Sequence, residues 1–534
     1  MDPISYNLAR RAILEKPIPP YSAIVRKDEN TVWAKDPEGK TIASGKAGVD
    51  DGGVIHSAIN NCLQGTIVIA KGEYNIKGIA IRIEGDCKNL RLIGYGATLK
   101  ATDSGHNLIT IQKGDNATKP ENIVVEGFYL DGTPDMHAIS IQGGKNVIVK
   151  NCFITNAYTA GVEVTHYLGE CSEDIKIIKN KIINCGGMGI YIGTGDTAYT
   201  RRVIIEDNII DTTGVSDYVD KDGIFIDGGY DVSVRSNKIY NAGGQGIGLY
   251  GYADVVNIED NTIVNAAGAG IRGGNTEYTS CKIIHNKISG CLRGIALTHT
   301  VANTVVEDNR IKDSTEHGIL VNLYGSGETL HNIKLLYNII SGCGKQGIRV
   351  SGYHPDAAAE DIDVIGNTIK DCSLESAGGY DGIQFNFVQH GKIERNRISG
   401  ANHRYNVRTE NASDYVDIVL NELGDYHTGQ LSVVGLNNII RQNRGYTTEN
   451  SGTATFDGDG TTTDFSIGAH GLVTSDSSKI AVKVTPVSQD AINASPCVGY
   501  VDPADNTKIR VKFASPPASG SENVKIVWYA EVIS

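Results

Sequence analysis

The sequence has 534 residues, of which 63 are glycine and 13 are proline, a composition that favours many tight turns over a disordered or collagen-like chain. No run approaches the roughly 18 to 20 consecutive apolar residues of a membrane-spanning helix, so no membrane span is expected. The net charge is −13 and no basic stripe offsets it, which argues against nucleic acid as a ligand.

Residues 1–45 are predicted to form a separate N-terminal region. A short helix with Pro3 in its first turn is expected there, followed by a proline-rich break at KPIPPY. Strands are expected around SAIVRK and TVWAK, because both segments alternate apolar and polar residues.

A short amphipathic helix is predicted over residues 50–64, with Asp50 as its N-cap. Its apolar face would carry Ile55, Ala58 and Ile59. The segment TIVIAKGEYNI follows and reads as a first strand and turn.

A repeat of about 23 to 29 residues dominates residues 46–447, and each copy contains an apolar-polar-apolar strand that runs into an asparagine. The asparagines of this series are Asn151, Asn180, Asn208, Asn237, Asn261, Asn286, Asn309, Asn338, Asn367, Asn396, Asn421 and Asn443. A Gly-Ile strand follows most of them about ten residues later. Three short strands per repeat predict a parallel β-solenoid of about eleven coils. The asparagines are expected at a sharp turn, in left-handed backbone, with each amide bonded to the next coil.

The pattern changes again near the C-terminus, where the asparagine repeat stops and threonine, serine, aspartate and glycine increase. The segments TATFDGDGTTTDFSI, KIAVKVTPVS, TKIRVKFA and NVKIVWYAEV read as four or more antiparallel strands. Residues 451–534 are therefore predicted to be a small β-sandwich.

The strand repeat and the helix over 50–64 resemble those of the right-handed parallel β-helix superfamily, which contains pectate lyases, polygalacturonases, alginate epimerases and phage tailspikes. The resemblance covers roughly residues 45–445. It implies an all-β fold, a right-handed parallel β-helix whose open end the helix closes, and a terminal β domain for trimerisation or carbohydrate binding. The aspartate motifs of polygalacturonases and the Asp-Pro-His motif of alginate epimerases are absent, so the resemblance is specific for the fold and not for one activity.

The outer face of the Gly-Ile strands is the predicted binding surface. If Ile224 and Ile226 point inward, Phe225 and Asp227 point outward. In the same register, one outward column contains Glu163, Tyr191, Phe225, Arg272, Leu320, Arg349 and Gln384, and the next contains Asp227 and Tyr250. Aromatic rings, guanidinium groups and carboxylates together suit sugar rings and their hydroxyl groups.

Acidic residues are densest around residues 206–231, beside a long loop over 211–222. Three interpretations remain open. Paired carboxylates could perform acid–base chemistry on a glycosidic bond, several aspartates could hold calcium, or the loop could simply be a solvated acidic segment.

Candidate residues are assigned on this basis. Asp222 and Asp227 would lie about 16 Å apart on one strand, so a carboxylate pair needs a partner from the loop or from a nearby coil. The candidate catalytic residues are Asp227, Asp222, Glu163, Asp220 and Tyr250. The candidate substrate-binding residues are Tyr191, Phe225, Arg272, Arg293 and His317. No residue is assigned to a metal, and calcium is the one cofactor considered.

The predicted function is action on an extended glycan, as a glycoside hydrolase or polysaccharide lyase, with epimerase activity less favoured. The alternative is a non-catalytic glycan-binding or structural spike. The resemblance also implies a homotrimer and a virus or prophage tail component. The first residues lack the features of a secretory signal, so the chain is expected to be cytoplasmic, associated with a virion and extracellular after release by lysis, or recorded without a leader.

Overall fold

The computed structural model describes residues 19–78, 81–114, 118–132, 136–193, 199–217, 220–274, 280–474 and 477–533. The helix predicted around Pro3 lies outside these residues. No described helix is long and apolar enough to cross a membrane.

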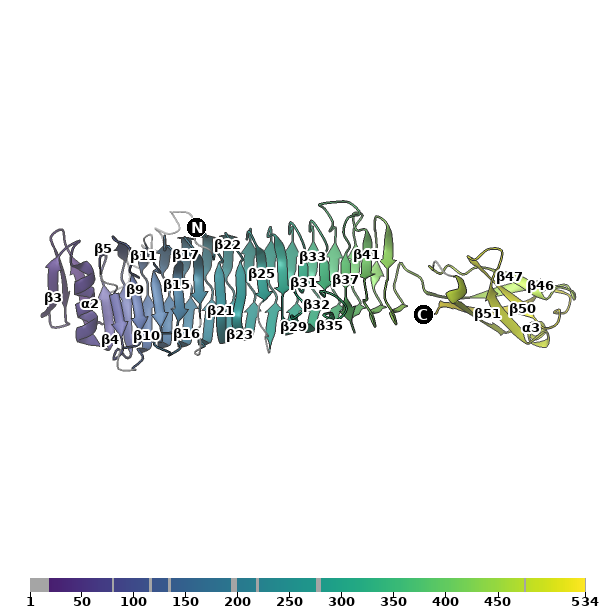
Figure 1. Cartoon of the computed structure of the whole chain (residues 1–534), viewed down its shortest axis with the longest axis horizontal. Coiled ribbons are helices and arrows are strands. Elements are labelled where there is room, and N and C mark those ends of the chain that lie inside the picture. Colours follow the sequence, from purple (N-terminus) through teal and green to yellow (C-terminus); the bar gives the residue numbers. More distant parts are fainter. Residues whose placement is uncertain are drawn as a thin grey trace.

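The central part of the chain is a right-handed parallel β-helix of about 12 turns, close to the eleven expected. Each turn contributes one strand to each of three faces, and each strand pairs in parallel with the equivalent strand of the next turn. Figure 1 shows these strands stacked side by side along one axis. We number the faces 1 to 3 in the order in which the chain visits them within a turn.

Face 1 consists of the strands that run toward the ladder asparagine. They are β4 (Gly65–Ile69), β7 (Leu90–Gly94), β10 (Glu121–Glu126), β13 (Lys145–Lys150), β16 (Glu173–Ile178), β19 (Arg201–Glu206), β26 (Cys281–Ile284), β29 (Val301–Glu307), β32 (Leu330–Leu336), β35 (Ala359–Ile365), β38 (Val388–Gln389), β39 (Lys392–Glu394), β42 (Asp417–Val419) and β45 (Ile439–Arg441).

Face 2 consists of the short strands after the asparagine, which form a separate sheet. They are β5 (Gly72–Ile76), β8 (Ala97–Ala101), β11 (Tyr129–Asp131), β14 (Phe153–Thr155), β17 (Lys181–Cys185), β20 (Ile209–Thr213), β22 (Lys238–Ala242), β24 (Thr262–Val264), β27 (Lys287–Ser289), β30 (Arg310–Lys312), β33 (Ile339–Ser341), β36 (Thr368–Lys370), β40 (Arg397–Ser399) and β43 (Glu422–Leu423).

Face 3 consists of the Gly-Ile strands and their counterparts in the first and last turns. They are β6 (Ile81–Glu84), β9 (Ile109–Gln112), β12 (Ile139–Gln142), β15 (Ala160–Thr165), β18 (Met188–Ile192), β25 (Ala269–Gly274), β28 (Arg293–Thr298), β31 (Ile319–Asn322), β34 (Ile348–Ser351), β37 (Ile383–Asn386), β41 (Tyr405–Glu410) and β44 (Gly429–Ser432). Two long strands, β21 (Ile224–Arg235) and β23 (Ile247–Glu259), run across face 3 and continue into face 1 of the next turn.

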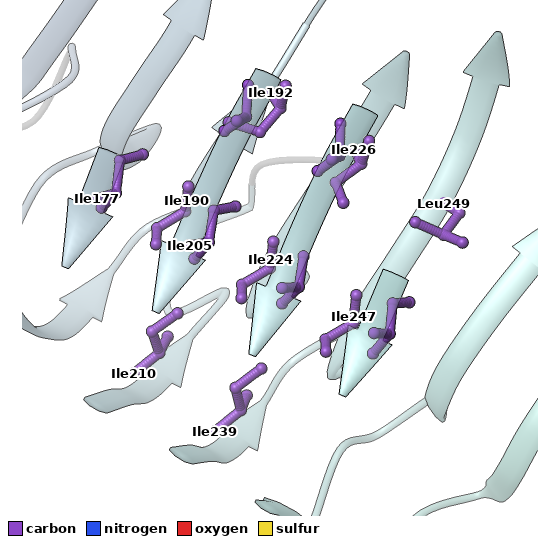
Figure 2. Close-up of a cluster of buried hydrophobic side chains, with 14 of the residues drawn as sticks. Ile177, Ile190, Ile192, Ile205, Ile210, Ile224, Ile226, Ile239, Ile247 and Leu249 are labelled. Carbon is purple, nitrogen blue, oxygen red and sulfur yellow. The ribbon is translucent and has the colours of Figure 1, made fainter. Parts of the chain in front are cut away.

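The core is a set of columns of branched aliphatic side chains, one from each turn. Ile224, Ile226, Ile247 and Leu249 are fully buried and point into the interior, as predicted for the Gly-Ile strands (Figure 2). Alternating in-and-out side chains on each strand explain why every second residue is apolar.

The ladder asparagines are buried at the corner between faces 1 and 2. Asn261, for example, donates from its backbone N–H and its Nδ2 to Oδ1 of Asn286, at 3.0 Å each, and from Nδ2 to the carbonyl of Val234 at 2.9 Å. These bonds repeat from Asn180 to Asn443, so the predicted ladder is confirmed over that range.

Two details of the ladder prediction are wrong. The left-handed residue is the one that precedes each asparagine, as at Asp207 (φ 55°) and His285 (φ 57°), whereas the asparagine donates its backbone N–H to Oδ1 of the next asparagine. Asn151 does not extend the ladder, because it is exposed and left-handed. Cys152 takes the ladder position and donates its N–H to Oδ1 of Asn180.

Helix α2 (Asp51–Cys62) covers the N-terminal end of the solenoid (Figure 1). Its predicted apolar face is confirmed, since Ile55, Ala58 and Ile59 are all buried. Asp50 occupies the N-cap position but does not cap the helix, because its carboxylate accepts the Lys46 N–H instead. Three antiparallel strands lie beyond the helix, namely β1 (Ala23–Lys27), β2 (Thr31–Lys35) and β3 (Thr41–Lys46).

The C-terminal part is a separate small sandwich of two three-stranded antiparallel sheets (Figure 1). One sheet contains β46 (Glu449–Gly458), β51 (Gly520–Val532) and β48 (Ile480–Pro486), and the other contains β47 (Asp464–Ala469), β50 (Lys508–Phe513) and β49 (Cys497–Val501). A short helix, α3 (Gln489–Asn493), joins β48 to β49. Phe513 and Ile526, one from each sheet, share its core.

Candidate active site

The register of face 3 brings four of the predicted site residues, Glu163, Tyr191, Phe225 and Arg272, into one outward column. Tyr191 pairs with Phe225, Phe225 with Gly248, and Gly248 with Arg272. Gly248 interrupts the predicted column because its turn supplies no side chain at this position.

The interruption is filled by Tyr250, two residues further along β23. Its ring stacks on Phe225, with centroids 4.7 Å apart and planes 18° apart, and Phe225 is in turn 5.6 Å from Tyr191. Arg272 lies over the other side of the Tyr250 ring, 5.1 Å from its centroid. A Cβ at position 248 would lie 2.5 Å from this ring, so glycine is required for the stack. Three aromatic rings and a guanidinium therefore form one continuous strip.

Asp222 lies beneath the strip, in the column of residues that precede each Gly-Ile pair; we call this the leading column. Its Oδ1 accepts the Gln245 N–H at 2.6 Å, whereas its Oδ2 is buried without a well-formed hydrogen bond from any described residue. The pKa of Asp222 is raised to about 7, chiefly by burial and also by the charge of Asp220, while the Gln245 N–H, Arg272 and Tyr250 act in the opposite direction.

Asp227 is half-buried on β21, five residues after Asp222. The pairing of β21 with β23 shifts register between Ile226 and Gly228. On β23, Gly251 adopts the left-handed backbone (φ 60°) at this shift. A Cβ at position 251 would lie 2.2 Å from the Asp227 carbonyl. Burial and the charge of Asp220 raise the pKa of Asp227, and a hydrogen bond with Tyr191 lowers it.

Asp220 thus influences both of the other aspartates from the loop that precedes β21. Of the partners considered for Asp227, this loop carboxylate is the one whose charge acts on the pKa of Asp227.

Glu163 belongs to a different cluster, two turns toward the N-terminus. Its carboxylate accepts hydrogen bonds from Ser140 and Gln142 and lies 3.3 Å from Nε2 of His137. Burial lowers the pKa of His137, and the charge of Glu163 partly opposes this effect. The carboxylate of Glu163 is therefore already engaged, and the structure does not bring it to Asp227.

Arg293 and His317 lie further along the leading column, three and four turns beyond Asp222. Arg293 forms an ion pair with Glu316 at 2.6 Å, and Glu316 also binds Lys345 at 2.8 Å. Burial lowers the pKa of His317 to about 3, with a further contribution from the charge of Arg349, so this imidazole is neutral at physiological pH. Neither residue reaches the Asp222–Asp227 cluster.

The rest of the acidic segment disperses over other faces. Glu206 pairs with Arg235 on face 1, and Asp211 on β20 accepts from Nδ2 of Asn241 on the neighbouring face 2 strand β22. Among the described residues, the group with the spacing of a cation site lies elsewhere, at Glu259, Asp260 and His285, on a mostly exposed turn. The three aspartates near Tyr250 do not form such a group within the described part of the chain, which gives the calcium interpretation no geometric support.

Comparison with known proteins agrees with this architecture. Residues 222–354 match the family model described as "Right handed beta helix region". The whole chain resembles a double mutant of the tailspike protein of E. coli bacteriophage HK620, with a TM-score of 0.57 at 12% identity over 93% of this chain and 92% of that one. A mutant of the same tailspike in complex with a pentasaccharide gives a TM-score of 0.50 at 12% identity, with the same coverage.

A third similar structure is the pre-mature gene product 12 of bacteriophage phi29, with a TM-score of 0.54 at 16% identity over 74% of this chain and 54% of that one. The search of curated proteins finds no match. By its fold, the molecule is thus a parallel β-solenoid with a terminal β domain. More specifically, its fold is the right-handed parallel β-helix, and residues 222–354 match the family model of that description.

Proposed function

We propose that the protein binds an extended polysaccharide along face 3 and hydrolyses it beside Asp227. The observation that carries this proposal is the strip of Tyr191, Phe225 and Tyr250, which runs directly past carboxylates whose pKa values are raised. The stacked rings leave Phe225 only 8% exposed, so a sugar would contact the half-buried Tyr191 and Tyr250, and Phe225 would support them. A carboxyl group with a raised pKa suits donation of a proton to a glycosidic oxygen.

In this proposal, Asp227 is the general acid. Burial and the charge of Asp220 shift its pKa upward, which is the direction that a proton donor needs, and its half-buried position at the surface makes it accessible. Asp220 is the second carboxylate, which activates a water molecule or attacks the anomeric carbon. Asp222 lies beside Tyr250, and in this proposal it helps to position the ring.

A lyase receives less support from the same groups. Elimination needs a base that removes a proton from the sugar ring at neutral pH. Burial raises the pKa of Tyr250 to about 12, so its hydroxyl holds its proton, and the imidazole of His317, with a pKa of about 3, is a very weak base. Carboxylate chemistry is therefore preferred to proton abstraction.

A non-catalytic glycan-binding spike is the second candidate, and one observation favours it. Oδ1 of Asp222 accepts the N–H of the next turn, and Gln245 and Asp381 do the same for Ala269 and Tyr405. Asp222 thus helps to join neighbouring turns of the solenoid, a role that does not depend on catalysis and that a protein which only binds glycan would also need. Assembly into a tail-associated spike would suit either candidate, given the likeness in fold to the HK620 tailspike.

The first prediction separates the two candidates. On a panel of bacterial surface polysaccharides, the protein should release new reducing ends from at least one glycan, and Asp227→Asn should lower that rate by about 100-fold or more while glycan binding persists. Asp363→Asn is the matched control. Asp363 is also half-buried with a raised pKa, but it lies on face 1, so this change should leave turnover intact.

Full turnover by folded Asp227→Asn would refute this catalytic assignment. Binding to a glycan without any new reducing ends would establish the spike instead. Products that absorb near 232 nm, an expectation from the superfamily's uronate lyases, would indicate elimination.

A further inference from the structure

Further along face 3, several side chains each have one buried polar atom that makes no hydrogen bond to a described residue. Among the described residues, Nδ1 of His317, Oε1 of Gln346 and Nε of Arg349 are all buried and make no hydrogen bond. His317 and Gln346 are only 5% and 4% exposed. Such orphaned groups are costly in a folded protein unless water or a ligand satisfies them.

The three residues belong to two adjacent turns. His317 and Gln346 are consecutive in the leading column, because the Gly318 N–H bonds to the Gln346 carbonyl. Arg349 lies in the outward column, between Leu320 and Gln384. The charge of Arg349 lowers the pKa of His317, as expected for two groups that lie close together.

A chain of hydrogen bonds between side-chain amides determines which atom of Gln346 has no partner. Glu410 accepts from Nε2 of Gln384 at 2.6 Å, so the Gln384 amide oxygen faces the other way and accepts from Nε2 of Gln346. Since a carboxylate can only accept, the amides must run in this direction, and the free end is the acceptor Oε1 of Gln346.

Arg349 is left without a counter-charge because each neighbouring carboxylate has another partner. Glu316 binds Arg293 and Lys345, Asp381 binds Arg404, and Glu410 binds Arg408. Within the described ranges, no carboxylate pairs with Arg349. A half-buried guanidinium without a counter-ion is a receptor for a carboxylate or phosphate group.

We propose that Arg349, Gln346 and His317 form a subsite for an anionic sugar residue, either a uronate or a phosphorylated sugar. Arg349 would donate to the anionic group, while Oε1 of Gln346 would accept from a sugar hydroxyl and Nδ1 of His317 would pair with another. Five turns separate Arg349 from Phe225, which is about 24 Å along the axis. Ala269, Ala296 and Leu320 form an apolar floor between the two sites.

The place of this subsite in a glycan groove rests on the proposed function, but anion binding at Arg349 does not. The test therefore uses monosaccharides rather than a polymer. Glucuronate, glucose 6-phosphate and glucose are titrated separately into the full chain and followed by ligand-observed NMR. Binding of at least one anionic sugar, with no comparable binding of glucose, is expected, and the two anionic probes show which group the subsite prefers.

Arg349→Gln should weaken that binding tenfold or more, because it removes the charge and retains a polar side chain of similar reach. Arg397→Gln is the matched control, since Arg397 is an exposed cation on face 2. Gln346→Glu offers a second variant, which supplies Arg349 with an internal carboxylate and should also abolish binding of the anionic sugar.

Equal binding of all three probes, or unchanged binding by both variants, would overturn the proposal. Asp227→Asn should bind the anionic monosaccharide as the wild type does. A failure of the catalytic proposal would therefore leave this result standing, and the reverse also holds.

Discussion

Asp222 shows how a single residue meets two demands on face 3. One carboxylate oxygen bonds to the backbone of the next turn, and the other is buried beside the Tyr250 ring, directly over Gly248. The first interaction stabilises the solenoid in either protonation state, whereas the second makes ionisation unfavourable. The charge on Asp222 is therefore a cost to the fold at neutral pH.

Replacing Asp222 by asparagine should stabilise the protein at high pH. The pKa of Asp222 is about 7 in the folded protein and about 4 in the unfolded chain, so wild-type stability falls as pH rises between these values. Asparagine keeps the oxygen that Gln245 needs and cannot ionise. The variant should unfold at nearly the same temperature as the wild type at pH 4 and at a higher temperature at pH 8, with a gain of up to about 4 kcal/mol.

The control is Asp313→Asn, at an exposed, left-handed turn residue that asparagine suits equally well. It should unfold like the wild type at both pH values. If the gain from Asp222→Asn were the same at pH 4 and pH 8, the buried carboxyl would not have the raised pKa.

The sequence predicted the members of this site better than their arrangement. Alternation along the Gly-Ile strands correctly placed Tyr191, Phe225 and Arg272 in one column, because register follows from the repeat. It could not show that Tyr250 leans into the gap above Gly248, because that depends on a register shift near Gly228. Side-chain contacts between neighbouring turns, such as that of Glu163 with His137, could not be predicted from the sequence either.

At the scale of the element, the asparagine ladder holds the corner between faces 1 and 2. Each member satisfies the buried backbone N–H of the preceding asparagine and a carbonyl of face 1, as Asn286 does for Asn261 and Ile258. The repeat spacing predicted the ladder itself, since one residue type recurred once per turn. Which residue adopts the left-handed backbone was not readable from spacing alone, because that position is chemically diverse.

Asn286→Ala should lower the free energy of unfolding by about 3 kcal/mol or more. The change removes the acceptor of the Asn261 N–H and Nδ2, as well as the donor to the Ile258 carbonyl, and leaves buried polar groups unpaired. The measurement is the midpoint of chemical denaturation. Asn257→Ala, at a half-buried position of β23 outside the ladder, should shift the midpoint much less. Equal shifts would mean that the ladder does not contribute specifically.

At the scale of the whole molecule, large apolar side chains gather on the surface of the last turns. The exposed fractions are 70% for Leu436, 54% for Val434 and 52% for Tyr415. Exposed apolar groups that cluster in this way often mark protein interfaces. They lie in the last turns before the C-terminal sandwich, for which trimerisation or carbohydrate binding is predicted.

We expect the protein to be a homotrimer, with a mass by light scattering three times that of the 57.1 kDa chain. Leu436→Asp should shift the equilibrium toward monomers by placing a charge in the interface. Leu168→Asp, at an equally exposed apolar residue in a loop near the other end, should not. A monomeric wild-type protein at micromolar concentration would refute the trimer and leave the fold unaffected.

Because the turns stack on one another, the number of turns in the solenoid can change independently of the side chains that form each site. Each turn advances the axis by about 4.8 Å and contacts mainly its two neighbours. Gain or loss of one complete turn between Arg272 and Arg349 would therefore change their spacing by a fixed step and leave the surroundings of both residues intact. The number of turns between the two sites therefore sets the length of glycan that can contact both, and that length can change in evolution without any change in either site.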